Sequence, residues 1–149
     1  MIKLANYEVV LLDMDTLIIE NKEFETDISI MKTIEYLNSK YLVYGITKYN
    51  KLEVYKHIKK LYLRMYFQDI ISTQMIDLKD VKKLVNCIAK QTLNSDLSKT
   101  ILVSDKNLFQ TALSRSIIDT CLINKNSEQD SSQRVEYEIE NFSKIKKYL

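Results

Sequence analysis

Short apolar runs alternate with amphipathic stretches along most of the chain. The first run, Val9–Leu12, is continuous and half β-branched, which is typical of a strand buried on both faces of a sheet. Four later runs have a similar character, and the segments between them carry apolar residues three and four positions apart, the period of a helix. The predicted strands are 9–12, 41–46, a short one around 70–71, 100–103 and 120–123. The predicted helices are 27–40, 50–62, 79–93, one from 107 onward, and 133–149.

This alternation predicts an α/β fold built from βαβ units. We expect a doubly wound, Rossmann-like parallel sheet of five strands in the order 3-2-1-4-5, with helices on both faces. No repeat or shift in composition divides the 149 residues, so a single domain spanning 1–149 is expected. Proline is absent and glycine occurs once, so helix ends must rely on Asn, Asp, Ser and Thr. Residues 124–134 are expected to form a polar loop or a loosely ordered linker.

Polar residues follow several of the predicted strands directly. Asp13 and Asp15 end the first strand, Thr47 ends the second, Lys79 opens the third helix and Asp105 follows the fourth strand. In a doubly wound sheet these positions meet beside strands one and four. Carboxylates that face one another repel unless a cation or a proton lies between them. Three carboxylates suit Mg²⁺, and a hydroxyl and an ammonium group beside them suit a phosphoryl group.

The composition of the chain limits the kinds of partner that it is expected to bind. A net charge of +2 gives no support for binding to nucleic acid or to an anionic membrane, and no apolar run is long enough to span a bilayer. The start of the chain, Met1–Lys3, lacks a secretory pattern. Cys87 and Cys121 show no metal-ligand spacing and are interpreted as buried thiols of a reducing compartment. We therefore expect a cytoplasmic protein whose partner is a phosphorylated substrate.

Taken in order, these motifs resemble those of the haloacid-dehalogenase-like phosphatases. The first motif of that family is a strand followed by Asp-x-Asp-x-Thr/Val, and the second is an apolar strand that ends in Thr or Ser. The third is a lysine that opens a helix, and the fourth is a strand that ends in an acid. The matching segments here are 13–17, 43–47, Lys79 with Lys82 and Lys83 as alternatives, and 101–105.

The resemblance implies a magnesium-dependent phosphohydrolase that acts through an aspartyl-phosphate. Asp13 would be the nucleophile, and Asp15 would first protonate the leaving oxygen and then activate water. Thr47 and Lys79 would hold the phosphoryl oxygens. The Asp13 carboxylate, the backbone carbonyl of Asp15 and the side chain of Asp105 would bind Mg²⁺.

Three positions depart from the family pattern. Leu17 stands where Thr or Val is usual, although a deleted glycine would align Thr16 with that position instead. Ser104 replaces a common glycine, and Phe109 stands where a second acid often follows. These departures favour the alternative hypothesis, a domain of this family that has lost turnover and binds or regulates. A phosphoacceptor receiver domain fits less well, because the third strand ends in Ser72 rather than aspartate.

The spacing between motifs leaves little room for an inserted lid. There are 31 residues between Asp15 and Thr47, and again 31 between Thr47 and Lys79, and a helix uses much of each interval. The chain therefore resembles the capless subclass of the family, which has an open site. Either the substrate is large, or another subunit of a homo-oligomer covers the site.

Overall fold

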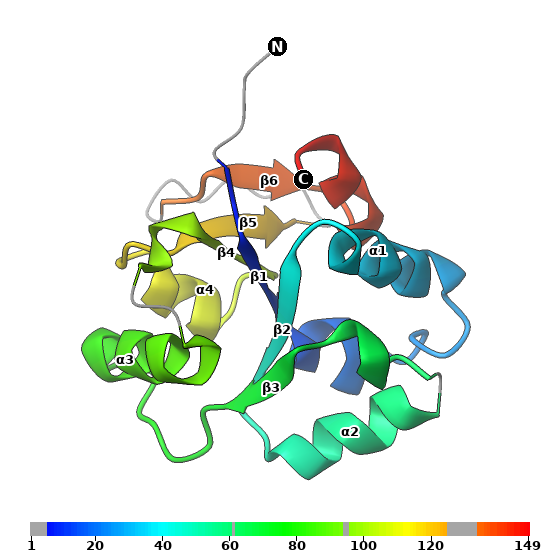
Figure 1. Ribbon diagram of the computed structural model, residues 1–149, viewed down its shortest axis with the longest axis horizontal. Coiled ribbons are helices and arrows are strands. Elements are labelled where there is room, and N and C mark those ends of the chain that lie inside the picture. Colours follow the sequence, from blue (N-terminus) through cyan, green and yellow to red (C-terminus); the bar gives the residue numbers. More distant parts are fainter. Residues whose placement is uncertain (1–5, 61, 94–95, 125–133) are drawn as a thin grey trace.

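A parallel sheet of six strands forms the centre of the molecule. The computed structural model describes residues 6–60, 62–93, 96–124 and 134–149. The strand order is β3-β2-β1-β4-β5-β6, and every neighbouring pair is parallel (Figure 1). The strands are β1 Val9–Asp13, β2 Leu42–Thr47, β3 Asp69–Ser72, β4 Thr100–Ser104, β5 Asp119–Ile123 and β6 Tyr137–Ile139.

Helices cover both faces of this sheet. The α-helices are α1 Ile28–Asn38, α2 Lys51–Lys59, α3 Val81–Thr92 and α4 Leu108–Leu113. The shorter turns are the π-helical η1 Asp15–Ile19 and the 3₁₀-helical η2 Arg64–Tyr66, η3 Leu97–Lys99 and η4 Phe142–Lys147. Helices α1 and α2 lie on one side of the sheet and α3 and α4 on the other (Figure 1). The predicted doubly wound α/β fold is confirmed, with one strand more than expected.

The central strand β1 packs against both helical layers. Val10 and Leu12 belong to the apolar core beneath α1 and α2, whereas Val9 and Leu11 belong to the core beneath α3 and α4. All four side chains are buried, as the continuous apolar run predicts. This double burial fixes the strand in the middle of the sheet, and therefore fixes the position of Asp13 at its carboxyl end.

Asn and Asp side chains cap the four α-helices, as the lack of proline and glycine predicts. Asp27 Oδ1 accepts from Ser29 N at 3.0 Å, and Asn50 Oδ1 accepts from Glu53 N at 2.9 Å. Asp80 caps α3. The prediction that a lysine at position 79 opens this helix is therefore wrong, because the cap lies one residue later and the helix begins at Val81.

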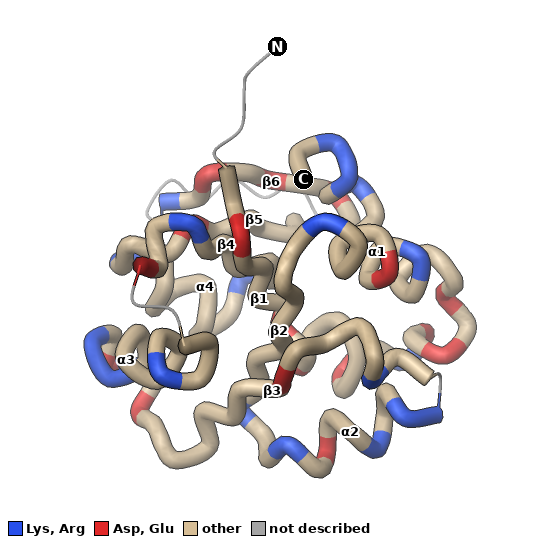
Figure 2. The backbone as a smooth tube through the Cα atoms, viewed as in Figure 1, with Lys and Arg blue, Asp and Glu red and all other residues tan. Residues whose placement is uncertain are grey.

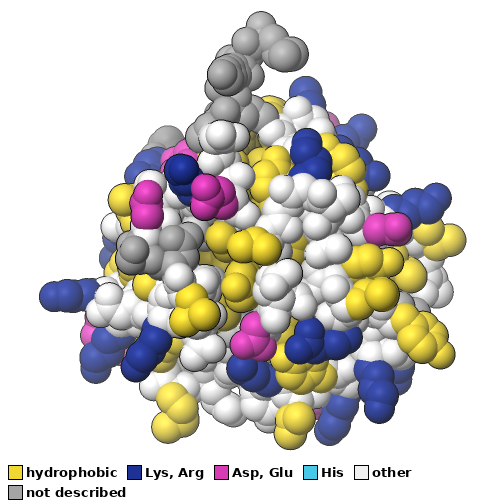
Figure 3. All heavy atoms as spheres, viewed as in Figure 1, with side chains coloured by type: hydrophobic (Ala, Val, Ile, Leu, Met, Phe, Trp, Pro, Cys, Tyr) yellow, Lys and Arg dark blue, Asp and Glu magenta, His cyan; other side chains and the backbone are white. Residues whose placement is uncertain are grey.

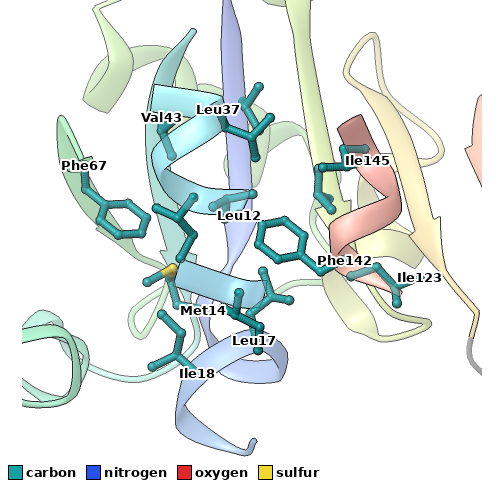
Figure 4. Packing of buried hydrophobic residues seen from close by; sticks show 14 of the residues in the cluster. Leu12, Met14, Leu17, Ile18, Leu37, Val43, Phe67, Ile123, Phe142 and Ile145 are labelled. Carbon is teal, nitrogen blue, oxygen red and sulfur yellow. The ribbon is translucent and has the colours of Figure 1, made fainter. Parts of the chain in front are cut away.

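The carboxyl-terminal segment differs from the helix predicted over 133–149. Tyr137–Ile139 forms β6 beside β5, and Phe142–Lys147 forms η4. Ile139, Phe142 and Ile145 are nevertheless buried, and η4 packs on α1. Figure 4 shows the Phe142 ring pointing from η4 toward Leu12 of β1. The predicted loop over 124–134 falls almost wholly outside the described residues.

Most charged side chains lie at the periphery of the molecule, and Asp13 and Asp15 are buried exceptions. In Figure 2 the tube through the central strands is mostly tan, and the basic and acidic residues lie mainly on helices and connections. On the face drawn in Figure 3, Lys and Arg side chains lie both at the rim and within the outline. Within the described ranges, no helix is both long and apolar enough to cross a membrane.

Candidate active site

The carboxylates of Asp13 and Asp105 come together at the carboxyl ends of β1 and β4. These strands pair through Leu12 and Val103, so the residues that follow them are neighbours. Thr16 Oγ1 lies 2.8 Å from Asp105 Oδ1 and 3.2 Å from Asp13 Oδ2. Because a hydroxyl has one proton, Thr16 can donate to only one of these oxygens at a time. The π-helical turn η1 places this hydroxyl between the strands.

Asn107 also bridges this pair of carboxylates. Its Nδ2 donates to Asp13 Oδ2, and to Asp105 Oδ1 at 2.9 Å. Its Oδ1 accepts from the backbone N–H groups of Phe109 at 2.9 Å and Gln110 at 3.2 Å, which caps α4. The side-chain amide therefore joins the first turn of α4 to the acidic pair.

Asp15 lies beside this cluster, but its carboxylate turns toward β2. Thr47 Oγ1 donates to Asp15 Oδ1 at 2.5 Å, and Lys48 N donates to Asp15 Oδ2 at 2.9 Å. The Thr47 hydroxyl in turn accepts from Tyr49 N at 3.0 Å. Asp13 and Asp15 are thus close in sequence but bonded to different strands, which gives the two carboxylates different surroundings.

Both of these buried carboxyl groups resist ionisation. Burial raises the pKa of Asp13 to about 6; the Asn107 hydrogen bond lowers it, and the charges of Asp15 and Asp105 raise it further. Burial also raises the pKa of Asp15, against the opposing effect of its hydrogen bonds from Thr47 and Lys48. A cation near Asp13 would therefore relieve an unfavourable charge.

A small cavity opens over the cluster. Its volume is about 120 Å³, and Asp15, Thr16, Asp105 and Asn107 contribute to its lining. Asp13 is wholly buried and is absent from this lining, and its Oδ2 is hydrogen-bonded by Thr16 and Asn107. The rest of the lining is Glu20, Lys48, Leu78, Leu108 and Phe109.

The lysines predicted for the phosphoryl site are not part of this cavity. Lys79 is exposed, and its backbone N–H donates to Asp77 Oδ1 at 2.9 Å. Lys82 and Lys83 are exposed on α3, where Lys83 pairs with Asp80. Lys48 lines the cavity instead, with its Nζ 3.4 Å from Glu20 Oε2.

Sequence reasoning missed three polar residues of the site. Asn107 was expected only as the start of the helix predicted from 107 onward, and Lys48 and Glu20 were not considered. Thr16 was raised only as an alternative to Leu17, and the structure separates the two: the Thr16 hydroxyl joins the cluster, whereas Leu17 is buried in the core. The position of Lys48 directly after the strand that ends in Thr47 was the available signal.

The donor set fits Mg²⁺, with two carboxylates rather than three. Within the described residues no three His, Cys, Asp or Glu side chains converge, because the Asp15 carboxylate turns toward Thr47. Mg²⁺ commonly binds one or two carboxylates and completes its shell with water and substrate phosphate. The Asp15 carbonyl accepts from Glu20 N at 2.7 Å and keeps a second lone pair.

Solved structures of other proteins are similar to this chain in fold, whereas sequence comparisons find no match. No protein-family model matches the chain, and no curated protein matches its sequence. The HAD-hydrolase YfnB from Bacillus subtilis, described as bound to magnesium, has a TM-score of 0.67 at 17% identity, covering 79% of this chain and 53% of that one. A HAD phosphatase from Thermococcus onnurineus has a TM-score of 0.60 at 20% identity, covering 80% and 55%.

A third structure matches over almost its whole length. It is the core domain of a Streptococcus pneumoniae protein assigned as a phosphoglycolate phosphatase, with a TM-score of 0.68 at 11% identity, covering 97% of this chain and 96% of that one. The chain thus spans about half of the two larger proteins and nearly all of this domain. At these identities the likeness shows that the chain has the fold of the HAD-like hydrolases.

Proposed function

We propose that the chain is a magnesium-dependent phosphohydrolase that forms an aspartyl-phosphate on Asp13. The observation that supports this most directly is the different bonding of the two carboxylates at the end of β1. Asp13 shares hydrogen-bond donors with Asp105, whereas Asp15 lines the cavity and is held by Thr47 and Lys48. A nucleophile and a proton carrier require such separate surroundings.

In the first step, an Asp13 oxygen attacks phosphorus while the bond from phosphorus to the leaving oxygen breaks. Asp15 gives its proton to that oxygen, and its raised pKa favours the protonated form that this requires. In the second step, Asp15 takes a proton from water, whose oxygen attacks phosphorus and frees Asp13. Bound by Asp13 and Asp105, Mg²⁺ would neutralise carboxylate and phosphoryl charge.

The phosphoryl oxygens need donors and positive charge from the chain. The family resemblance assigns these roles to Thr47 and Lys79. The Thr47 hydroxyl is engaged with Asp15, so its first role is to orient that carboxylate. Lys48 lines the cavity and is paired with a half-exposed Glu20, and it can meet an entering phosphoryl group by leaving that weak surface pair. Lys48 is therefore the cation that the geometry favours.

The test is magnesium-dependent release of phosphate from an aryl phosphate. The native chain should release phosphate, and Asp13→Asn should not. Asp15→Asn should accept the phosphoryl group but hydrolyse it slowly, so intact-protein mass spectrometry should detect the added phosphoryl group. Asp96→Asn is a matched control, because Asp96 precedes β4 at the opposite edge of the sheet. Equal activity in the native chain and Asp13→Asn would contradict the proposal.

A second candidate is a domain of this fold that binds a phosphorylated partner without turnover. The covering of Asp13 by Thr16 and Asn107, and the apolar Phe109, favour it. This candidate predicts that Mg²⁺ and inorganic phosphate bind the native chain, while no aryl phosphate is hydrolysed and no phosphoryl group appears on Asp13.

A further inference from the structure

Asn107 holds the space between the two carboxylates that would bind a cation. Its Nδ2 donates to Asp13 Oδ2 and to Asp105 Oδ1, and it lies 3.4 Å from Thr16 Oγ1. An amide nitrogen of this kind is a donor with no lone pair to offer a metal. The group that points at the carboxylates is therefore one that a cation must displace.

The orientation of this amide is fixed at both of its ends. Asn107 Oδ1 accepts from Phe109 N and Gln110 N, two groups in the first turn of α4 that have no partner within the helix. Turning the amide over would set Nδ2 against these two donors and Oδ1 against the carboxylate oxygens. Both ends would then lose their hydrogen bonds, so Asn107 cannot readily become an oxygen ligand.

We propose that Asn107 weakens cation binding at this site, because its amide bridges Asp13 and Asp105 and must be displaced before a divalent cation can bind both. The inference rests on the proposed function for the identity of the cation, Mg²⁺, and concerns its affinity rather than the hydrolysis. In the absence of the cation, the same amide keeps the two carboxylates together by giving each of them a hydrogen bond.

Two substitutions at position 107 remove the amide donor but keep an oxygen that can cap α4. Asn107→Ser keeps an oxygen that can cap α4 but removes the Nδ2 donor. Asn107→Asp also keeps a capping oxygen and replaces the donor with a second oxygen that can bind a cation. We expect Mg²⁺ to bind Asn107→Ser several-fold more tightly than the native chain, and Asn107→Asp at least about tenfold more tightly.

The measurement is isothermal titration calorimetry with MgCl₂ on protein stripped with EDTA, together with the shift of the thermal midpoint that MgCl₂ produces. The matched control is Asn50→Asp, which places the same charge at the cap of α2, where Asn50 bonds Glu53 N. This control should bind Mg²⁺ as the native chain does, so that a general effect of added charge is separated from the local one.

The result for Asn107→Ser decides the inference. Affinity equal to or weaker than that of the native chain, with an unchanged thermal midpoint in EDTA, would overturn it, because removal of the donor would then give no advantage. Absence of Mg²⁺ binding in the native chain and both Asn107 variants would overturn it as well. Failure of the proposed function has a different signature, since the expected order of affinities can hold in a chain that releases no phosphate.

Discussion

Asp13→Asn should remove the part of the pH-dependent loss of stability that ionisation of Asp13 causes in the metal-free chain. The pKa of Asp13 is raised from 3.8 to about 6, chiefly by burial. A carboxyl group whose pKa is raised by folding binds its proton more tightly in the native state, so the native state loses free energy relative to the unfolded state once the proton leaves. A shift of about two pKa units corresponds to roughly 3 kcal/mol.

These pKa values determine whether stability rises or falls with pH and the pH range in which it changes. Below about pH 4, Asp13 is protonated in both states and imposes no penalty. Between about pH 4 and pH 6 the penalty grows, and above this range it is constant. The free energy of unfolding of Asp13→Asn minus that of the native chain should therefore rise through this window. Asp15, whose pKa is also raised, is present in both proteins, but its charge raises the pKa of Asp13, so the difference reports the coupled pair of carboxylates.

The assay is urea unfolding followed by circular dichroism, in EDTA, at pH values from 4 to 8. Asn at position 13 has one acceptor oxygen in place of two, so Asp13→Asn loses the hydrogen bond either from Asn107 or from Asp15 N. This loss lowers its stability by about 1 kcal/mol at every pH, so the change with pH is the informative quantity. Asp96→Asn is the control, because its hydrogen bonds from Ser98 lower the pKa of Asp96 and give the opposite sign. A difference that is flat or falls with pH would refute the reasoning.

Three further outcomes are expected. Lys48→Met should lower kcat/KM for an aryl phosphate by about tenfold in steady-state kinetics, which is a larger loss than Lys79→Met should cause. A larger loss in Lys79→Met would show that Lys79 supplies the positive charge at the phosphoryl group. Gly45→Val should lower the free energy of unfolding in urea by about 1–3 kcal/mol, since a Cβ there would lie 2.6 Å from Met14 Cγ. Gln110→Met should raise it by about 1 kcal/mol, because both polar atoms of the Gln110 side chain are buried without a partner among the described residues; a fall would reveal a missed partner.

The central strands could be predicted from the sequence because strands that are buried on both faces require continuous apolar runs. Val9–Leu12 and Ile101–Val103 are continuous apolar runs, and the structure buries them between two helical layers. The same reasoning failed at the carboxyl terminus. Ile139, Phe142 and Ile145 are spaced as on a helix and are buried as predicted, but an edge strand and a 3₁₀ turn bury them equally well. The spacing of apolar residues therefore predicts which positions are buried more reliably than it predicts whether those positions lie on a helix, a strand or a turn.

The site was predictable only as far as its carboxylates. Asp13 and Asp105 follow paired strands, so the strand order alone brings them together. The direction of the Asp15 carboxylate depends on the π-helical turn η1 and on the hydroxyl of Thr47, and no local pattern in the sequence indicates either. Lys79 was assigned as the lysine that opens the third helix, whereas the first turn of α3 begins after it.

The departure at Phe109 and the bridging amide of Asn107 belong to one local arrangement. Phe109 is buried in the core beneath α3 and α4, and its backbone N–H donates to Asn107 Oδ1. The apolar ring fixes the first turn of α4, and that turn in turn fixes the amide that faces Asp13. An acid introduced at position 109 would therefore place a charge in the apolar core and disturb the cap, whereas an acid at position 107 would face the carboxylate pair directly. If an additional ligand strengthens cation binding in this chain, Asn107→Asp should do so and Phe109→Asp should not, although position 109 is where the family pattern has its second acid.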